Sequence, residues 1–325
     1  MVVLVIGGTG FLGRQLVPEL LRAGHEVLVY HRGQREGLPF PGVRHLHGER
    51  GDLGRLTAPV PVEAVIDIRP MNGEDSRPLV EAFRGRVARS VHVSSLDVYR
   101  AWAAAREGRA TDAVPFPEEA PLREKLHLYP ELPGYEKILM ERAVMGVDGL
   151  PAAVVRLPVI YGPHDRQRRE WPLLKRLLEG RPVLMGGGSI WLWQRVYVRE
   201  AARAIIRVLE TPAAMGHIFN AGEASAMTLW QWAEAIGRAA GVAADIRVLP
   251  DALLPPHLEL YRTWWQHIVG DTTKLRALTG YTEERTREED LAESVAWHRE
   301  NAPEEDQAVY REQIALEEAA LRACP

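Results

Sequence analysis

The chain has 325 residues, of which 46% are hydrophobic, enough for one large or two ordinary domains with a sizeable core, and this composition excludes a disordered chain. The formal charge of −4 gives no general case for binding nucleic acid or a membrane surface. The single cysteine, Cys324, excludes an intrachain disulfide and a thiolate metal site. No apolar run of about 18 residues is present to span a bilayer, so we expect a soluble cytoplasmic protein.

The first predicted strand covers residues 2–6, a continuous apolar run rich in β-branched side chains, as in a strand buried on both faces. It has no basic leader and glycines follow at once, so we interpret it as a strand and not as a signal peptide. A glycine-rich loop, GGTGFLG, occupies residues 7–13. A helix is predicted from Phe11 to a stop at Gly24, and residues 25–30 form the next strand.

The glycines of this loop have the spacing G-x-G-x-x-G at Gly8, Gly10 and Gly13. They lie between the first strand and the first helix of a βαβ unit, which makes the motif specific. Glycines let the backbone approach a pyrophosphate, and the helix N-terminus adds free N–H groups and a positive dipole end. The loop therefore predicts a dinucleotide site; the alternative is a tight turn without a ligand.

The end of the second strand indicates which dinucleotide is bound. A cofactor with a free ribose diol calls for Asp or Glu here, but the residues are Tyr30, His31 and Arg32, with Arg35 close by. Arg32 is placed to pair with a 2′-phosphate. We therefore predict NADP(H) in preference to NAD(H); the alternative is that Arg32 is a solvated loop charge.

Further strands alternate with helical stretches along the first half of the chain. Such repeated βα units predict a doubly wound parallel sheet, with the ligand at the carboxyl ends of the strands. Asp67, Ser95 and Pro158 fall at that edge. The strands are predicted within residues 43–53, 64–68, 90–99 and 152–163.

Several motifs of the chain resemble those of one protein family, and they occur in the same order along the sequence. IGGTGFLG resembles the family's T-G-G-T-G-F-I-G loop, VSSLDVY its S-S-x-x-V-Y-G, and VVRLPVIYGP its R-P-x-N-V-Y-G-P. Similar correspondences continue through residues 186–205, 218–236, 271–281 and 291–300. In these motifs the chain resembles the extended short-chain dehydrogenase/reductases, the nucleotide-sugar epimerases and dehydratases.

The resemblance implies a doubly wound Rossmann domain at residues 1–163, with returning segments near 190–225. A smaller α/β substrate-binding lobe is expected at 164–300 and a helical tail at 301–325, packed on the body or on a partner. It also implies an NAD(P) cofactor, a small-molecule substrate and a homodimer.

The family's catalytic set is a Ser or Thr, a Tyr and a Lys, and the resemblance implies that Ser95 and Lys137 fill two of these roles. Tyr and Lys are spaced Y-x-x-x-K, because residues i and i+4 share a helix face. In LPGYEKILME the tyrosine position falls on Pro133, and Tyr135 lies only two residues before Lys137. On a helix these two side chains would point about 200° apart. We therefore predict that the phenol acid is missing and that the usual hydride chemistry is in doubt.

The chain differs from the family motifs at further positions, as expected of an atypical member of the family. Val159 replaces the motif's asparagine and Arg199 an aspartate, and Arg69-Pro70-Met71 is expected to crowd the nicotinamide pocket. The surroundings of residues 64–68 resemble the atypical branch that includes chloroplast stem-loop-binding proteins. Two hypotheses stay open: an epimerase, dehydratase or reductase acting on a nucleotide-sugar-like or other small substrate, and a non-catalytic NADP(H)-binding protein that regulates or binds RNA.

The remaining candidates complete the expected sites. Substrate contacts are expected from Arg195, Asp97 and Tyr161. No metal site is expected, because His45 and His47 alternate on a strand with no third ligand near. The basic cluster at 164–170 is either a solvated loop or a contact for RNA or an anionic substrate, and the tryptophans of the second lobe either stack on a base or pack in the core. The candidate cofactor-binding residues are Gly7, Gly8, Thr9, Gly10, Phe11, Leu12, Gly13, His31, Arg32, Arg35, Glu49, Arg50, Ser94, Lys137, Leu157 and Pro158.

Overall fold

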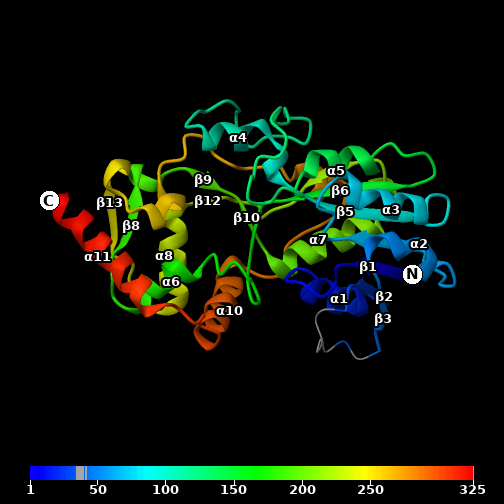
Figure 1. Cartoon of the computed structure of the whole chain (residues 1–325), viewed down its shortest axis with the longest axis horizontal. Helices are drawn as coiled ribbons and strands as arrows, with labels where there is room; N and C mark the ends of the chain where they lie inside the picture. Colours follow the sequence, from blue (N-terminus) through cyan, green and yellow to red (C-terminus); the bar gives the residue numbers. More distant parts are fainter. Residues whose placement is uncertain (34–39, 41, 325) are drawn as a thin grey trace.

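A seven-stranded parallel sheet forms the centre of the computed structural model, which describes residues 1–33, 40 and 42–324 (Figure 1). The strand order is β11-β6-β5-β4-β1-β2-β3, and every neighbouring pair is parallel. This order confirms the predicted doubly wound Rossmann sheet. The strands are β1 (Val2–Ile6), β2 (Glu26–His31), β3 (Arg44–His47), β4 (Ala64–Asp67), β5 (Arg89–Ser95), β6 (Ala152–Leu157) and β11 (Ile218–Asn220).

Helices cover both faces of the sheet, as the apolar runs of the strands require. Along β1, Val3 and Val5 face one core with the helices α1 (Gly13–Arg22) and α7 (Val198–Glu210). Leu4 and Ile6 point the other way, into a second core. The helices on that second face are α2 (Leu53–Thr57), α3 (Gly73–Phe83) and α5 (Lys137–Val144).

A smaller group of elements lies at the other end of the molecule (Figure 1). Its two strands pair in parallel, and helix α8 packs against α6 and α10. The C-terminal helix packs on this group: its Ala320 is buried, and its Glu317 pairs with the buried Arg176. The elements are α6 (Trp171–Leu178), β8 (Val183–Gly186), α8 (Leu229–Ala240), β13 (Ile246–Leu249), α10 (Arg287–Glu300) and α11 (Gln307–Ala323).

Short strand pairs connect the two ends of the molecule. Strand β7 (Val159–Tyr161) pairs with β10 (Arg195–Tyr197), and β9 (Leu192–Trp193) pairs with β12 (Met227–Thr228). The chain then returns to the large sheet through α7 and β11. Helices α4 (Arg100–Arg106) and α9 (Thr273–Thr279) complete the fold. Across the described residues, no helix is both long enough and apolar enough to cross a membrane.

Candidate functional site

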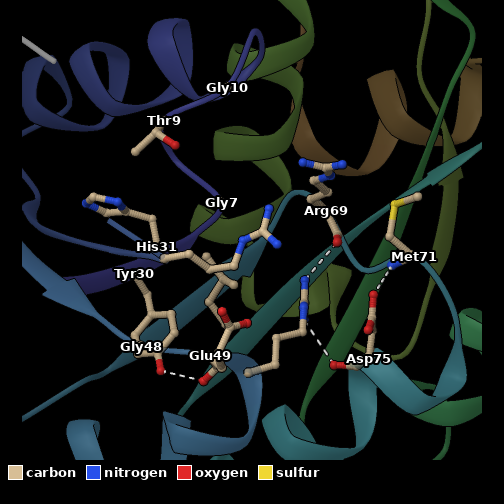
Figure 2. A pocket seen from close by; sticks show the side chains of 13 residues that line it. Gly7, Thr9, Gly10, Tyr30, His31, Gly48, Glu49, Arg69, Met71 and Asp75 are labelled. Carbon is tan, nitrogen blue, oxygen red and sulfur yellow. Dashed lines mark hydrogen bonds between the residues drawn. The ribbon is translucent and has the colours of Figure 1, made fainter. Parts of the chain in front are cut away.

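A cavity of about 360 Å³ opens at the carboxyl ends of β1, β2 and β4 (Figure 2). This is the edge at which doubly wound proteins bind their ligands. The wall combines the glycine-rich loop, the end of β2 and the segments that follow β3 and β4. The lining residues are Ile6, Gly7, Thr9, Gly10, Tyr30, His31, Arg32, Gly48, Glu49, Arg50, Arg69, Met71 and Asp75.

The glycine-rich loop is closely packed on one side and open on the other. A Cβ atom at Gly13 would lie 2.3 Å from the carbonyl oxygen of Gly8, and one at Gly8 would lie 2.9 Å from Val29 Cγ1. At Gly10 the nearest atom would be 3.9 Å away, so this residue leaves free space at the cavity. Helix α1 begins without a side-chain cap and without an acidic residue in its first turn. The loop and helix end therefore fit the phosphates of a dinucleotide.

His31 and Arg32, two of the candidate cofactor residues, line the cavity at the end of β2. Arg32 is exposed and its guanidinium is available to a ligand. Arg35, which was expected beside it, lies outside the described residues. Glu49 also lines the cavity, while its backbone carbonyl accepts a 2.8 Å hydrogen bond from the Tyr30 hydroxyl.

Arg50 fastens the two loops that form the cavity wall. Its guanidinium makes a bidentate pair with the buried Asp67, at 2.6 and 2.9 Å. It also donates to the backbone carbonyls of Arg69, at 2.7 Å, and Asp75, at 3.0 Å (Figure 2). Four of its hydrogen bonds are thus used within the protein, so Arg50 shapes the wall.

The segment Arg69-Pro70-Met71 lies between the cavity and the catalytic candidates. Arg69 and Met71 line the cavity, as expected of bulky residues at this position. The carbonyl of Pro70 accepts a 2.6 Å hydrogen bond from Lys137 Nζ. The same amine donates to the carbonyl of Val93, at 3.0 Å. Burial lowers the pKa of Lys137 to about 8, and Asp67 and Asp97 oppose this effect.

Tyr135 lies beside Lys137, which corrects the expectation from helix geometry. Helix α5 begins at Lys137 and Glu136 is its N-cap, so Tyr135 precedes the helix and its side chain is not bound by helical spacing. The Tyr135 hydroxyl donates a 2.8 Å hydrogen bond to Asp97 Oδ2, and Lys137 Nζ lies 5.6 Å from the Tyr135 ring centre. The prediction that these two side chains point in opposite directions is therefore wrong.

The helix starts at this point because of a buried ion pair. Arg123 donates to both carboxylate oxygens of Glu136, at 2.7 and 3.0 Å, and the two side chains are almost fully buried. Glu136 also accepts hydrogen bonds from the backbone N–H groups of His127 and Ile138. These contacts hold Glu136 in an extended conformation, with φ −157° and ψ 91°. The helix therefore begins only at the next residue, Lys137.

Asp97 is the centre of a group of hydroxyls. Its Oδ2 atom accepts from Tyr135 and, at 3.2 Å, from Tyr129. Its Oδ1 atom is buried and has no hydrogen-bond partner within the part of the chain that the structure describes. Burial raises the pKa of Asp97, and the Tyr135 hydrogen bond opposes that rise. Burial and the Asp97 charge raise the pKa of Tyr135, whereas a hydrogen bond with Ser95 lowers it.

The structure thus brings Ser95, Asp97, Tyr135 and Lys137 together. Ser95 is half-buried, and its hydroxyl oxygen accepts a 3.2 Å hydrogen bond from the Asp97 N–H group. Asp97 was expected to contact the substrate; it is 5% exposed, and its carboxylate accepts hydrogen bonds from two tyrosines. Tyr129 was not predicted, because it is eight residues from Lys137 and no local pattern marks the segment between α4 and α5.

Several candidate cofactor residues lie away from the cavity. Ser94 is 2% exposed, and its hydroxyl donates to Glu141, which pairs with the buried Arg156 at 2.7 Å. Leu12 and Leu157 are buried in the core on the α1 side of the sheet. Among the candidate cofactor residues that the structure describes, those that do not line the cavity are Gly8, Phe11, Leu12, Gly13, Ser94, Lys137, Leu157 and Pro158.

Arg195, the expected substrate contact, lies among aromatic rings. Its guanidinium carbon is 4.2 Å from the Trp232 ring centre, and Nη1 donates to the carbonyl of Trp193 at 3.0 Å. Burial lowers the pKa of Arg195 to about 10. Tyr161, the other expected contact, is 0% exposed and packs on Trp232 in the core, so it reaches no surface.

The tryptophans and the basic cluster are mainly structural. Trp102, Trp191, Trp193 and Trp264 pack against one another, with ring centres 5.2–5.8 Å apart. In the basic cluster of residues 164–170, Arg169 pairs with the buried Asp165 at 2.9 Å and Arg168 lies over the Trp297 ring. These contacts favour the packing alternative for the four tryptophans, and they occupy Arg168 and Arg169 within the protein, while Arg166 is exposed.

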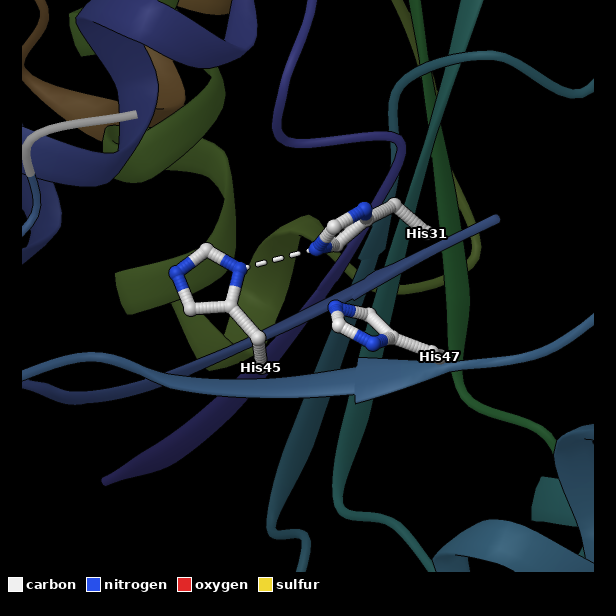
Figure 3. A group of neighbouring side chains, drawn as sticks. All are labelled: His31, His45 and His47. Carbon is white, nitrogen blue, oxygen red and sulfur yellow. Dashed lines mark hydrogen bonds between the residues drawn. The ribbon is translucent and has the colours of Figure 1, made fainter. Parts of the chain in front are cut away.

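A third histidine lies beside the two on strand β3, contrary to the expectation that no further ligand is near. His31 Nε2 is 2.8 Å from His45 Nδ1, and His47 is next to them (Figure 3). The sequence did not reveal this group, because it depends on how β2 and β3 pair.

The fold and the cavity define a Rossmann-type dinucleotide-binding protein. Residues 3–222 match the model of the NAD dependent epimerase/dehydratase family, and the chain belongs to that family. This membership confirms the resemblance seen in the sequence motifs. The family is named for a nicotinamide cofactor, and the glycine loop and cavity described above fit such a dinucleotide.

Two relatives show the range of this similarity. The chain is 27% identical over 335 residues to the dTDP-glucose 4,6-dehydratase of Streptomyces niveus, covering 93% of this chain and 94% of that protein. It is 26% identical over 255 residues to the chloroplast stem-loop binding protein of 41 kDa b of Arabidopsis thaliana. That match covers 74% of this chain but 63% of the relative, less than two thirds of its length.

Solved structures support the fold. A dTDP-glucose 4,6-dehydratase from Bacillus anthracis in complex with NAD matches with a TM-score of 0.72 and 19% identity, covering 93% of this chain and 97% of that one. A UDP-glucose 4-epimerase from Thermotoga maritima with UDP-glucose matches with a TM-score of 0.70 and 19% identity, covering 93% and 100%. At these identities the likeness concerns the fold alone.

Proposed function

We propose that the chain is an NADP(H)-dependent oxidoreductase that interconverts a hydroxyl and a carbonyl on a small, nucleotide-sugar-like substrate, as a reductase or as part of an epimerase or dehydratase reaction. One observation carries this proposal: the Tyr135 hydroxyl, bonded to Asp97 at 2.8 Å, lies with Ser95 and Lys137 at the sheet edge next to the cavity. The spacing that raised doubt about the tyrosine is no obstacle, because Tyr135 precedes the helix.

Three side chains bind the reacting oxygen or transfer its proton. A bound nicotinamide supplies or accepts the hydride. In the reducing direction, the hydroxyls of Ser95 and Tyr135 bind the carbonyl oxygen, and Tyr135 donates its proton to that oxygen as the carbon gains the hydride. In this direction Asp97 starts protonated and donates to the Tyr135 oxygen, so Tyr135 takes the Asp97 proton as it gives its own to the substrate. In the oxidising direction the same proton passes from the substrate hydroxyl through Tyr135 to Asp97.

This relay accounts for the unusual environment of the tyrosine. A raised pKa makes a lasting phenolate unfavourable at Tyr135. In the oxidising direction the Asp97 carboxylate removes the need for one, because it takes the phenol proton as the Tyr135 oxygen gains the proton of the substrate hydroxyl. Lys137 favours the ionised form of Asp97 by its charge.

The preference for NADP(H) rests on the end of β2. Arg32 lines the cavity next to His31, where a free diol would call for a carboxylate. An exposed guanidinium there suits a 2′-phosphate. The choice between the two cofactors is tested by their dissociation constants.

A nucleotide-sugar-like substrate is favoured by Arg195. Arg195 is 6% exposed and forms no ion pair with a carboxylate of the described residues, so an anionic group of a ligand is a suitable partner. Two structures of similar fold contain UDP-glucose, which is consistent with a nucleoside diphosphate group.

The test is a screen of UDP- and dTDP-sugars with NADP⁺ or NADPH, following nicotinamide absorbance. The expected result is a substrate-dependent change with the native chain and its loss in Tyr135→Phe. Epimerases and dehydratases regenerate their cofactor, so products are also separated by chromatography. Unchanged absorbance and unchanged sugars, with NADPH still bound, would reject catalysis on this class of substrate.

A second candidate is a non-catalytic NADP(H)-binding protein that binds RNA. The similarity to the chloroplast stem-loop binding protein favours it. Under this alternative, the chain binds a stem-loop RNA with a strong salt dependence, and Tyr135→Phe leaves this binding unchanged. Turnover and RNA binding, each measured with the native chain and with Tyr135→Phe, therefore distinguish the enzyme from the RNA-binding protein.

A further inference from the structure

Three histidines meet at the edge of the central sheet. His31 ends strand β2, and His45 and His47 are on the edge strand β3. The parallel register pairs His31 with His47 and Val29 with His45. Residues two apart on a strand share a face, and so do residues paired across strands. All three imidazoles therefore project from one face, as Figure 3 shows.

The nitrogen atoms of these rings converge on a small volume. One ring nitrogen from each histidine lies within 4.8 Å of the other two, and His31 Nε2 is 2.8 Å from His45 Nδ1. A zinc ion with Zn–N distances of about 2.1 Å places the nitrogens of a tetrahedral site about 3.4 Å apart. The observed spacing brackets that value, so small side-chain rotations suffice to bind an ion.

The surroundings of the three rings favour an ion that binds nitrogen. No carboxylate of the described residues forms an ion pair with any of the three rings, so no acidic side chain there competes for the imidazole nitrogens. Imidazole nitrogens are ligands for zinc, copper and nickel, whereas magnesium and calcium prefer oxygen.

We propose that His31, His45 and His47 form a binding site for a divalent transition-metal ion, with Zn²⁺ as the reference ion. Three protein ligands leave at least one position for water or another ligand. The Gly33 N–H group donates to His31 Nδ1 at 3.2 Å, so His31 carries its proton on Nε2. Coordination through Nε2 requires the other tautomer, with the proton on Nδ1, and metal binding therefore breaks the Gly33 contact.

The test is metal binding by the full chain after chelator treatment. Isothermal titration with Zn²⁺ at pH 7.5, and the visible absorption of the Co²⁺ form, are the two readouts. The expected result is one ion per chain, with nitrogen-type Co²⁺ bands and an affinity at least tenfold weaker in both His45→Ala and His47→Ala. His217→Ala is the matched control, since His217 is exposed and far from the group in the sequence, and it should bind like the native chain.

The proposal is overturned if the native chain binds no Zn²⁺ at micromolar concentration. It is also overturned if the His45 and His47 variants bind as the native chain does, because the metal then sits elsewhere. His47 is exposed, so His47→Ala is expected to fold; metal-free melting curves verify this. A zinc-induced rise in melting temperature that is present in His217→Ala and absent in His47→Ala gives the same answer without relying on titration heats.

Discussion

The Tyr135 hydroxyl donates a 2.8 Å hydrogen bond to Asp97, a residue 38 positions earlier in the chain. The contact joins the turn that follows β5 to the segment just before the N-cap of α5, and it places a phenol and a carboxylate beside Ser95. A phenol in contact with a carboxylate moves a proton in either direction without becoming a lasting anion. The proposed chemistry depends on this pair, which leads to the first two predictions.

Tyr135→Phe removes only the hydroxyl. We expect turnover to fall by about 10²- to 10⁴-fold, the usual contribution of a general acid, while the dissociation constant for NADPH stays unchanged. Tyr129→Phe is the matched control, because its longer 3.2 Å bond to Asp97 has no place in the relay. Steady-state rates and fluorescence titration of NADPH measure both quantities. Full turnover in Tyr135→Phe would exclude Tyr135 as the acid.

Asp97→Asn keeps an oxygen acceptor for both tyrosines but removes the charge. Burial raises the pKa of Asp97, so between its unfolded and folded pKa values the folded chain holds a proton that the unfolded chain lacks. The free energy of unfolding therefore falls as pH rises through that window. We expect the variant to lose this dependence and to lose about 10²-fold in turnover.

Asp112→Asn is the comparison variant, because folding lowers the pKa of Asp112 whereas it raises that of Asp97. The hydrogen bond from Arg100 lowers the pKa of Asp112, so its contribution to stability is present above the unfolded pKa and is lost as pH falls. Urea unfolding at several pH values measures both variants. An Asp97→Asn protein that loses stability at pH 8 relative to the native chain would contradict the assignment of Asp97 as a buried, strained carboxylate.

Arg32→Ala tests the choice of cofactor. A charge-assisted hydrogen bond contributes about 1.5–3 kcal/mol, so we expect NADPH affinity to fall at least tenfold while NADH affinity stays the same. Arg44→Ala is the control, because Arg44 is exposed on β3 and does not line the cavity. Titration of both cofactors into both variants decides the point. Equal losses for NADPH and NADH in Arg32→Ala would count against a 2′-phosphate contact.

Arg123→Met tests the ion pair that fixes the start of α5. Both side chains are almost fully buried, and removing one partner of such a pair destabilises a protein by about 3–5 kcal/mol. The exposed pair Arg77 and Glu74 is the control, and Arg77→Met should cost less than about 1 kcal/mol. Denaturant unfolding measures both. Similar costs for the two variants would mean that the buried pair does not hold the helix end.

Local patterns in the sequence predicted the central fold well. The apolar run at residues 2–6 became β1, Val2–Ile6, because every side chain of a central parallel strand needs an apolar partner. The glycine loop likewise followed from spacing alone, since the close approach of Gly13 to Gly8 admits no side chain. These features depend on neighbours within about a dozen residues.

Features set by distant contacts were not predicted. The helix start at Lys137 depends on Arg123, which the sequence does not link to Glu136 by any local pattern. The meeting of His31 with His47 depends on the register between β2 and β3, and no pattern within either strand states that register. In both cases the sequence showed the residues, and only the packing showed which ones meet.

The N-cap at Glu136 also bears on how proteins of this kind are sorted by sequence. A search that requires a tyrosine four residues before the lysine would discard this chain, although Tyr135 lies at the same edge as Ser95 and Lys137. Because helix α5 starts only at Lys137, Tyr135 lies outside the helix, and its side chain can lie where the tyrosine of the usual motif would be. Pattern searches for proteins of this family should therefore allow fewer residues between the tyrosine and the lysine wherever an acidic residue directly precedes the lysine.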